Sequence, residues 1–275
     1  MLGRLIKYEF KAGSRMFLLL YAALLLVSII NSILTYVGGG INQDNLVMSS
    51  IQSIFMVGYV ILIIAVAIAT LVLIIMRFYK NLLGDEGYLM FTLPVSTDSQ
   101  ILSKLITSII WTVLSALVMI ISIFVITAKY DSPQAVLNFF DRVSSAGVNV
   151  PYWVTMAIIS FLIYMVTIIM MFYASMAIGS NLTKNRLLGS FLGYVIIYIV
   201  SQVIGFVCVG IIYAGGFFSQ LGYYDAGTMP IERMIEMFDH VGMKLFLYIN
   251  ILNLIMAAVY YLVTRYFLKN RLNLS

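Results

Sequence analysis

The sequence predicts an all-α integral membrane protein with six transmembrane helices, and three observations support this fold class. Of the 275 residues, 63% are hydrophobic and only 10% are charged, which excludes a water-exposed globule. Six stretches of 20 or more residues lack any charge, and about 20 apolar residues suffice to cross the hydrocarbon core of a bilayer. The Lys and Arg residues, finally, are spread unevenly over the segments between these stretches.

Residues 1–15 are predicted to form an interfacial amphipathic helix, because apolar and basic side chains recur on two different sides at helical spacing. The apolar set is Leu2, Leu5, Ile6 and Phe10, and the basic set is Arg4, Lys7 and Lys11. Gly13 and Ser14 should allow a bend before the first span. The basic side can rest on anionic lipid or face an acidic partner surface, and both interpretations stay open.

The predicted spans are residues 16–37, 51–76, 105–127, 151–178, 188–213 and 245–264. The first follows basic residues, as a signal peptide would, but its apolar run is too long and no small-x-small cleavage site closes it. We therefore expect it to be retained as a helix.

The segment 77–104 between the second and third spans should face water, yet it carries an apolar cluster. The cluster consists of Tyr88, Leu89, Met90, Phe91 and Leu93. Asp85 is a suitable N-cap and Pro94 disfavours helix at the residue before it, which predicts a short helix over about 86–92. The run Thr97-Asp-Ser-Gln100 fits a capping box and predicts the start of the third membrane helix. The apolar cluster can act as a peg against a partner, or it can lie in the headgroup layer.

The segment 214–244 between the fifth and sixth spans is predicted to contain an amphipathic helix at the outer surface. Apolar residues repeat at helical spacing from Ile231 to Val241, and Pro230 suits the first turn. The segment can also be a simple cap over the helix bundle. His240 is expected to be a solvated surface residue.

The distribution of basic residues predicts that both termini are cytoplasmic, because basic flanks resist translocation. With this orientation, 12 of the 16 Lys and Arg residues fall in cytoplasmic segments and 4 in outer loops. The outer set is Lys129, Arg142, Arg233 and Lys244.

Polar and small residues within the spans indicate helix packing. Gln202, Asn250 and Asn253 can bridge helices or line a pathway, and bridging is the favoured interpretation. The spacings Gly189-xxx-Gly193 and Ala65-xxx-Ala69 allow close helix approach without identifying which helices meet.

Several functional classes are disfavoured by what the sequence lacks. The spans hold no ionisable residue of the kind that ion-coupled carriers commonly use, and the chain has no phosphate-binding G-x-x-x-x-G-K-[ST] loop. A single Cys208 and a single His240 give no metal-ligand set and no internal disulfide. We expect no catalytic residue, no directly bound metal or cofactor, and no nucleic-acid partner.

Two motif-like stretches resemble the membrane subunit of ATP-binding-cassette (ABC) exporters, in the type-two ABC permease family found in many Gram-positive bacteria. They are Leu5-Ile-Lys-Tyr-Glu-Phe-Lys11 and Glu86-Gly-Tyr-Leu-Met-Phe-Thr-Leu-Pro-Val-Ser96, within a six-span arrangement that covers essentially the whole chain. The resemblance implies one permease domain over 1–275, with a coupling helix that docks on a separate ATPase subunit. The implied coupling residues are Glu86, Tyr88, Leu89, Met90 and Phe91, with Lys7, Glu9 and Lys11 as possible neighbours.

The resemblance also implies how such a subunit would work. ATP and Mg²⁺ would be bound by the partner ATPase, a second copy or a related permease would complete the transport route, and the last outer loop could form a re-entrant element. Location in a bacterial plasma membrane follows from the family. An apolar or amphipathic cargo such as a peptide, lipid or drug would suit an uncharged route. The rival functions are an ion-coupled carrier or channel, and a non-transporting membrane scaffold or sensor.

Overall fold

A computed structural model describes residues 2–38, 46–84, 87, 95–127, 132–145, 147–182, 186–215 and 231–270 of the chain. These residues lie in helices and short turns, with no strand among them. Six of the described helices are long and apolar enough to cross a membrane, which confirms the prediction of an all-helical fold with six membrane-capable helices. The predicted coupling helix falls almost entirely on residues 85–86 and 88–94, outside the described part.

The chain divides into two compact units, each built on three long helices. The first unit comprises residues 1–78 and 94–139, and the second comprises residues 79–93 and 140–275. The expectation of one permease domain over 1–275 concerns the whole chain and stays a prediction.

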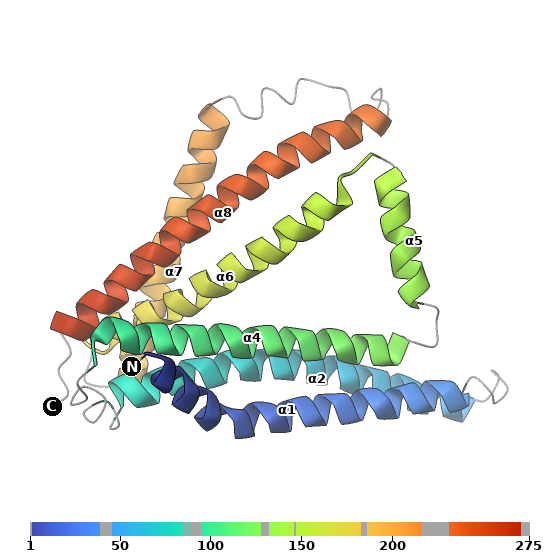
Figure 1. Cartoon of the computed structure of the whole chain (residues 1–275), viewed down its shortest axis with the longest axis horizontal. Helices are drawn as coiled ribbons and strands as arrows, with labels where there is room; N and C mark the ends of the chain where they lie inside the picture. The colour runs from blue at the N-terminus through green and yellow to red at the C-terminus, as the bar shows by residue number, and fades with distance from the viewer. Residues whose placement is uncertain are drawn as a thin grey trace. The chain divides into compact units, whose positions relative to one another are not determined.

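In the first unit, α1 (Leu2–Gly38) packs along both α2 (Leu46–Phe78) and α4 (Thr97–Thr127), as Figure 1 shows. The core of this unit is formed by Leu24, Tyr59, Val66 and Ile126. Between the helices, the Tyr59 hydroxyl forms a hydrogen bond with Ser122 Oγ at 2.8 Å. Because lipid cannot satisfy a stray polar group, such paired hydroxyls fix which helix faces meet.

Two helix starts in this unit differ in detail from the sequence-based expectation. Residues 2–38 form one uninterrupted helix, so Gly13 and Ser14 do not divide it, although its N-terminal part changes direction in Figure 1. The interfacial position of residues 1–15 stays a prediction. Helix α4 begins at Thr97 as expected, but the capping hydroxyl belongs to Ser96, which accepts a hydrogen bond from the Ser99 amide at 3.3 Å.

In the second unit, α6 (Val150–Gly179) packs on both α7 (Arg186–Ala214) and α8 (Ile231–Asn270). The short π-helix η1 (Tyr79–Leu83) belongs to this unit and contacts α6. Helix α6 is capped by Asn149, whose side chain accepts from the Tyr152 amide, and Pro151 lies in its first turn.

Helix α8 joins two elements that the sequence analysis treats separately. Residues 231–270 form one helix, so the predicted outer amphipathic helix runs directly into the last span. Gly242 lies between them without breaking the helix, and the Trp153 ring packs against it, where a Cβ would approach the ring to 2.8 Å. Residues 216–230, which would include a re-entrant turn, lie outside the described part.

A further helix, α5 (Ser132–Ser145), lies between the third and fourth spans and is not predicted by the sequence analysis. Its apolar and polar residues segregate to opposite sides, and Pro133 suits its first turn. The boundary between the two units falls within it, at Phe139 and Phe140.

Candidate functional site

A buried ion cluster links the three helices of the first unit. Glu9, on α1, accepts a hydrogen bond from Arg77 Nη2 at 2.9 Å and another from Lys104 Nζ at 2.5 Å. Arg77 lies in the last turn of α2, and Lys104 lies near the start of α4. Glu9 is 8% exposed and Lys104 is 3% exposed, so this cluster is largely removed from solvent.

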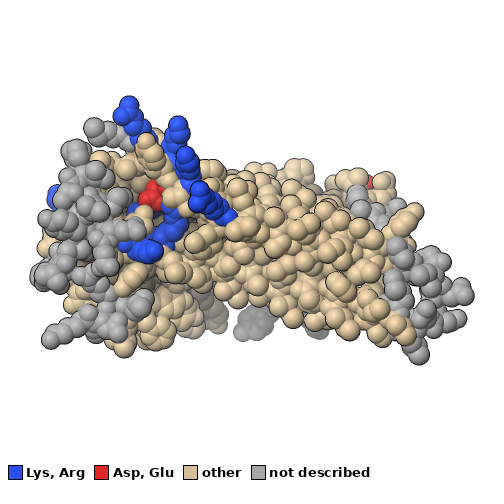
Figure 2. Space-filling view, turned by 90° about the horizontal axis from the view of Figure 1, so that it is seen from below, with Lys and Arg blue, Asp and Glu red and all other residues tan. Residues whose placement is uncertain are grey.

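The position of the ion cluster connects the segment 77–104 to helix α1. Arg77 and Lys104 are the first and last residues of the segment 77–104, which the sequence analysis predicts to be the coupling loop. One carboxylate therefore joins the last turn of α2 to the second turn of α4, the two helices that flank this segment, and holds both to α1. Figure 2 shows that Lys and Arg gather at one end of the face seen from below, whereas most of the remaining face carries neither sign of charge.

An aromatic stack adjoins the ion cluster. The rings of Phe10 and Phe17 each lie parallel to the Trp111 indole, with centroids 4.4 Å away and planes 8° apart. Two parallel rings at this distance must occupy opposite faces of the indole, so α1 holds α4 through Trp111. Tyr21 extends the contact by donating to the Trp111 carbonyl at 3.1 Å and pairing with Ser115 Oγ at 2.7 Å.

Gly13 allows this close approach of α1 to its neighbours. A Cβ at this position would overlap Nη1 of Arg77 and lie 3.1 Å from Nε1 of Trp111. Besides the predicted bend, Gly13 leaves space for the arginine that binds Glu9.

We expect Gly13→Ala to lower the free energy of unfolding by about 1 kcal/mol, because the methyl group displaces the Arg77 guanidinium from Glu9. Gly3→Ala on the same helix is the matched control, since a Cβ there meets nothing within 4 Å. Unfolding of both variants in mixed detergent micelles, followed by tryptophan fluorescence, measures the difference. Equal stability of the two variants would contradict the assigned role of Gly13.

The structure separates the three residues predicted on the N-terminal helix. Lys7 and Lys11 are exposed, whereas Glu9 points inward to Arg77 and Lys104. From the sequence, Arg77 and Lys104 are recognisable only as cytoplasmic flanking charges, so the cluster is not predicted. A signal was present: Glu9 is the single acidic residue before Asp44 and lies next to a membrane span.

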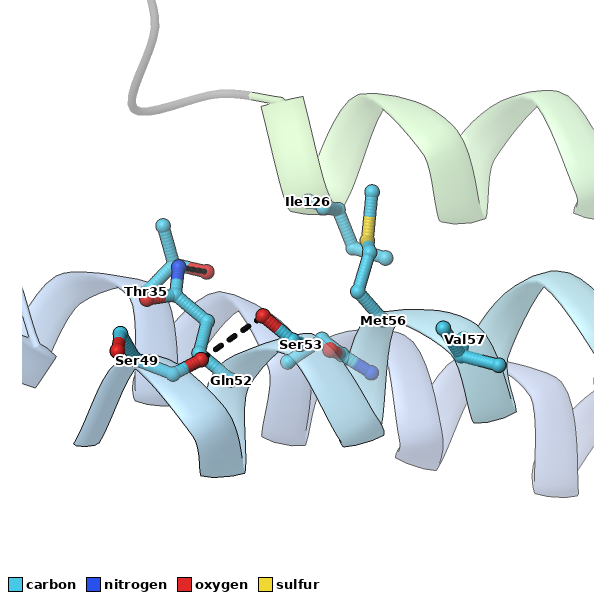
Figure 3. Close-up of a pocket in the computed structure, with 8 residues that line it drawn as sticks. Thr35, Ser49, Gln52, Ser53, Met56, Val57 and Ile126 are labelled. Atoms are coloured by element: carbon cyan, nitrogen blue, oxygen red, sulfur yellow. Dashed lines mark hydrogen bonds between the residues drawn. The ribbon is translucent and has the colours of Figure 1, made fainter. Parts of the chain in front are cut away.

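A cavity of about 490 Å³ opens between α1, α2 and the end of α4. Its polar lining comes from Asn31 and Thr35 on α1 and from Ser49, Gln52 and Ser53 on α2, while Met56, Val57 and Ile126 supply apolar walls. Figure 3 shows Thr35, the α2 residues and Ile126 around this cavity.

Hydrogen bonds within the lining fix several of these groups. Gln52 donates to Thr35 Oγ1 at 3.2 Å, Ser53 donates to the Ser49 carbonyl at 2.9 Å, and Asn31 donates to the Phe55 carbonyl at 3.3 Å. None of the residues lining this cavity is charged. The cavity could therefore accept a neutral molecule with both amide or hydroxyl groups and apolar groups.

The three polar residues singled out in the last two spans have different surroundings. Asn250 on α8 donates to Ser160 Oγ on α6 at 2.7 Å and so bridges these helices. The Asn253 side chain donates to the Ile249 carbonyl of its own helix, while its backbone carbonyl accepts from Thr167 on α6. Gln202 on α7 is exposed on the surface of the unit.

The predicted coupling residues all lie outside the described part of the chain. They are Glu86, Tyr88, Leu89, Met90 and Phe91.

Comparison with known proteins adds no family assignment: no protein-family model matches the chain, and no curated protein or solved structure matches it significantly.

Proposed function

We propose that this chain is the membrane-spanning permease subunit of an ABC exporter, which moves an apolar or amphipathic substrate with ATP hydrolysed by a separate subunit. The chain itself is not an enzyme in this proposal. Its six membrane-capable helices support a transport or scaffold role, and the resemblance of residues 5–11 and 86–96 to ABC permeases favours transport.

The observation that carries the proposal is the Glu9 cluster, which joins the two helices that flank the predicted coupling loop. If an ATPase pushes or pulls this loop, the force passes through Arg77 and Lys104 to Glu9 and so reaches α1, α2 and α4 together. A buried ion pair resists separation because removing one partner leaves a charge in a medium of low dielectric. Helices α1, α2 and α4 would therefore move together when the ATPase moves the loop.

The uncharged cavity supports the substrate class. Its amide and hydroxyl groups could bind the polar part of an amphipathic molecule, and Met56, Val57 and Ile126 could contact its apolar part. The chain would act in the bacterial plasma membrane with both termini cytoplasmic, beside a second permease copy or paralogue. ATP and Mg²⁺ would bind to the partner ATPase.

We expect the double variant Tyr88→Ala/Phe91→Ala to lose association with the partner ATPase, because it removes two large apolar side chains from the predicted coupling helix. The chain is purified from native membranes, and vanadate-sensitive ATP hydrolysis in the eluate measures the associated ATPase. Phe206→Ala, which truncates a 76% exposed aromatic on α7, is the matched control.

Two results would contradict the proposed function. Undiminished ATPase association and turnover in the double variant would remove the coupling assignment. Sustained uphill movement of a solute by the chain alone in nucleotide-free liposomes would instead indicate an ion-coupled carrier.

A further inference from the structure

Helix α5 carries an apolar side that is exposed to solvent in the structure. Val136, Phe139, Phe140 and Val143 follow the i, i+3, i+4, i+7 spacing of one helix side, and the first three are 42%, 62% and 39% exposed. The opposite side carries Gln134, Asn138, Asp141 and Ser145. A helix with this distribution needs an apolar environment along one side and water along the other.

The length of α5 excludes a membrane crossing. Its 14 residues extend about 20 Å at 1.5 Å per residue, and the hydrocarbon core is about 30 Å thick. Asp141 and Arg142 would also have to enter the core in a crossing orientation. Helices α4 and α6 therefore enter and leave the membrane on the same side of the bilayer, with α5 between them.

The connections at both ends keep α5 close to the membrane surface. Five residue steps separate Thr127 from Ser132, and five separate Ser145 from Val150, so each connection reaches at most about 18 Å. Ile123 and Phe124 remain 47% and 46% exposed near the end of α4, as expected for side chains in lipid.

The first turns of α6 mark the membrane boundary at the other connection. Tyr152 and Trp153 lie there, and these residue types concentrate at the membrane–water interface. The start and the end of α5 are thus each tethered to a helix that enters the bilayer nearby.

From these observations we infer that α5 lies along the bilayer surface, with Val136, Phe139, Phe140 and Val143 inserted among the lipid chains and its polar side in water. The partner of this surface is lipid, at the level of the headgroups and the first carbons of the acyl chains. Asp141 and Arg142 contribute no net charge, so the attraction is mainly apolar and needs no anionic lipid. This inference does not depend on the proposed transport function.

The test uses the full chain with Cys208, its only cysteine, replaced by serine. Single cysteines at Phe139 and Phe140 report on the apolar side, and single cysteines at Asn138 and Asp141 report on the polar side. Each is spin-labelled and reconstituted in phosphatidylcholine liposomes, with and without phosphatidylglycerol. Collision with oxygen, which partitions into lipid, is compared with collision with a water-soluble nickel chelate.

We expect the oxygen-to-nickel collision ratio to be several-fold higher at positions 139 and 140 than at 138 and 141, with or without the anionic lipid. A label at Phe206, 76% exposed on α7, gives the reference value for lipid contact. Equal ratios on the two sides of α5 would overturn the inference by placing the helix in water. Low collision with both reagents at 139 and 140 would also overturn it, because protein, such as a second copy of the chain, would then cover the apolar side.

Discussion

Glu9→Gln is expected to lower the free energy of unfolding by about 3–5 kcal/mol, the usual cost of breaking a buried ion pair by removing one partner. The amide keeps the size of the side chain but loses the charge that binds Arg77 and Lys104. Lys104, only 3% exposed, would then hold a buried ammonium group beside a second cation and a neutral amide. Unfolding in mixed detergent micelles measures this loss.

Two further variants separate this effect from a general sensitivity of α1. Lys11→Gln changes an exposed charge two residues away and should alter stability by less than about 0.5 kcal/mol. Adding Lys104→Met to Glu9→Gln removes the buried cation and should recover part of the lost stability. If Glu9→Gln and Lys11→Gln destabilise equally, Glu9 is not the link between the three helices.

The same variants bear on the proposed mechanism. If the Glu9 cluster passes movement of the loop 77–104 to α1, then the variant Glu9→Gln/Lys104→Met should still bind the ATPase. Movement of the loop should no longer reach α1 efficiently in this variant. ATPase association would be retained while ATP-dependent transport falls. The Tyr88→Ala/Phe91→Ala variant should instead lose both, so the two parts of the coupling hypothesis can be tested independently.

The sequence was sufficient to predict the six long helices because twenty uncharged apolar residues in a row have few alternatives to a membrane crossing. It could not predict that Glu9 faces Arg77 and Lys104, since these residues are 68 and 95 positions away and meet only when three helices pack. Helical spacing places Glu9 on a helix side but does not show which neighbour that side meets.

Helix boundaries outside the spans were also underdetermined. The composition of residues 231–241, polar on one side, predicts a helix separate from the last span, but one helix continues across that change of composition. Helix α5 was missed because a 14-residue amphipathic segment is too short for a search based on spans. Both cases show that the apolar pattern reports the environment of a helix better than its ends.

The small-residue spacing on α7 was recognised in the sequence, and the structure identifies its partner as α6. A Cβ at Gly193 would overlap the Ser175 carbonyl oxygen and lie 3.2 Å from the Gly179 amide, and a Cβ at Gly179 would overlap the backbone of Gly189. Ser175 and Gly179 on α6 therefore face Gly189 and Gly193 on α7. Phe172 and Tyr194 stack beside this contact, with ring centroids 5.2 Å apart.

We expect Gly193→Ala to lower the free energy of unfolding by about 3 kcal/mol, at the upper end of the cost of overpacking, because the obstructing atoms belong to backbone and cannot change rotamer. The helix propensity of alanine works in the opposite direction by about 0.5–1 kcal/mol. Unfolding in mixed micelles gives the net effect, which should be destabilising.

Gly205→Ala provides the control on the same helix, since a Cβ there meets nothing within 4 Å. This variant retains the propensity gain without the overlap and should be neutral or slightly more stable than the natural chain. The two alanine variants differ only in whether a neighbouring backbone occupies the space. If both raise or both lower stability by the same amount, α6 and α7 do not meet through this pair of small-residue motifs.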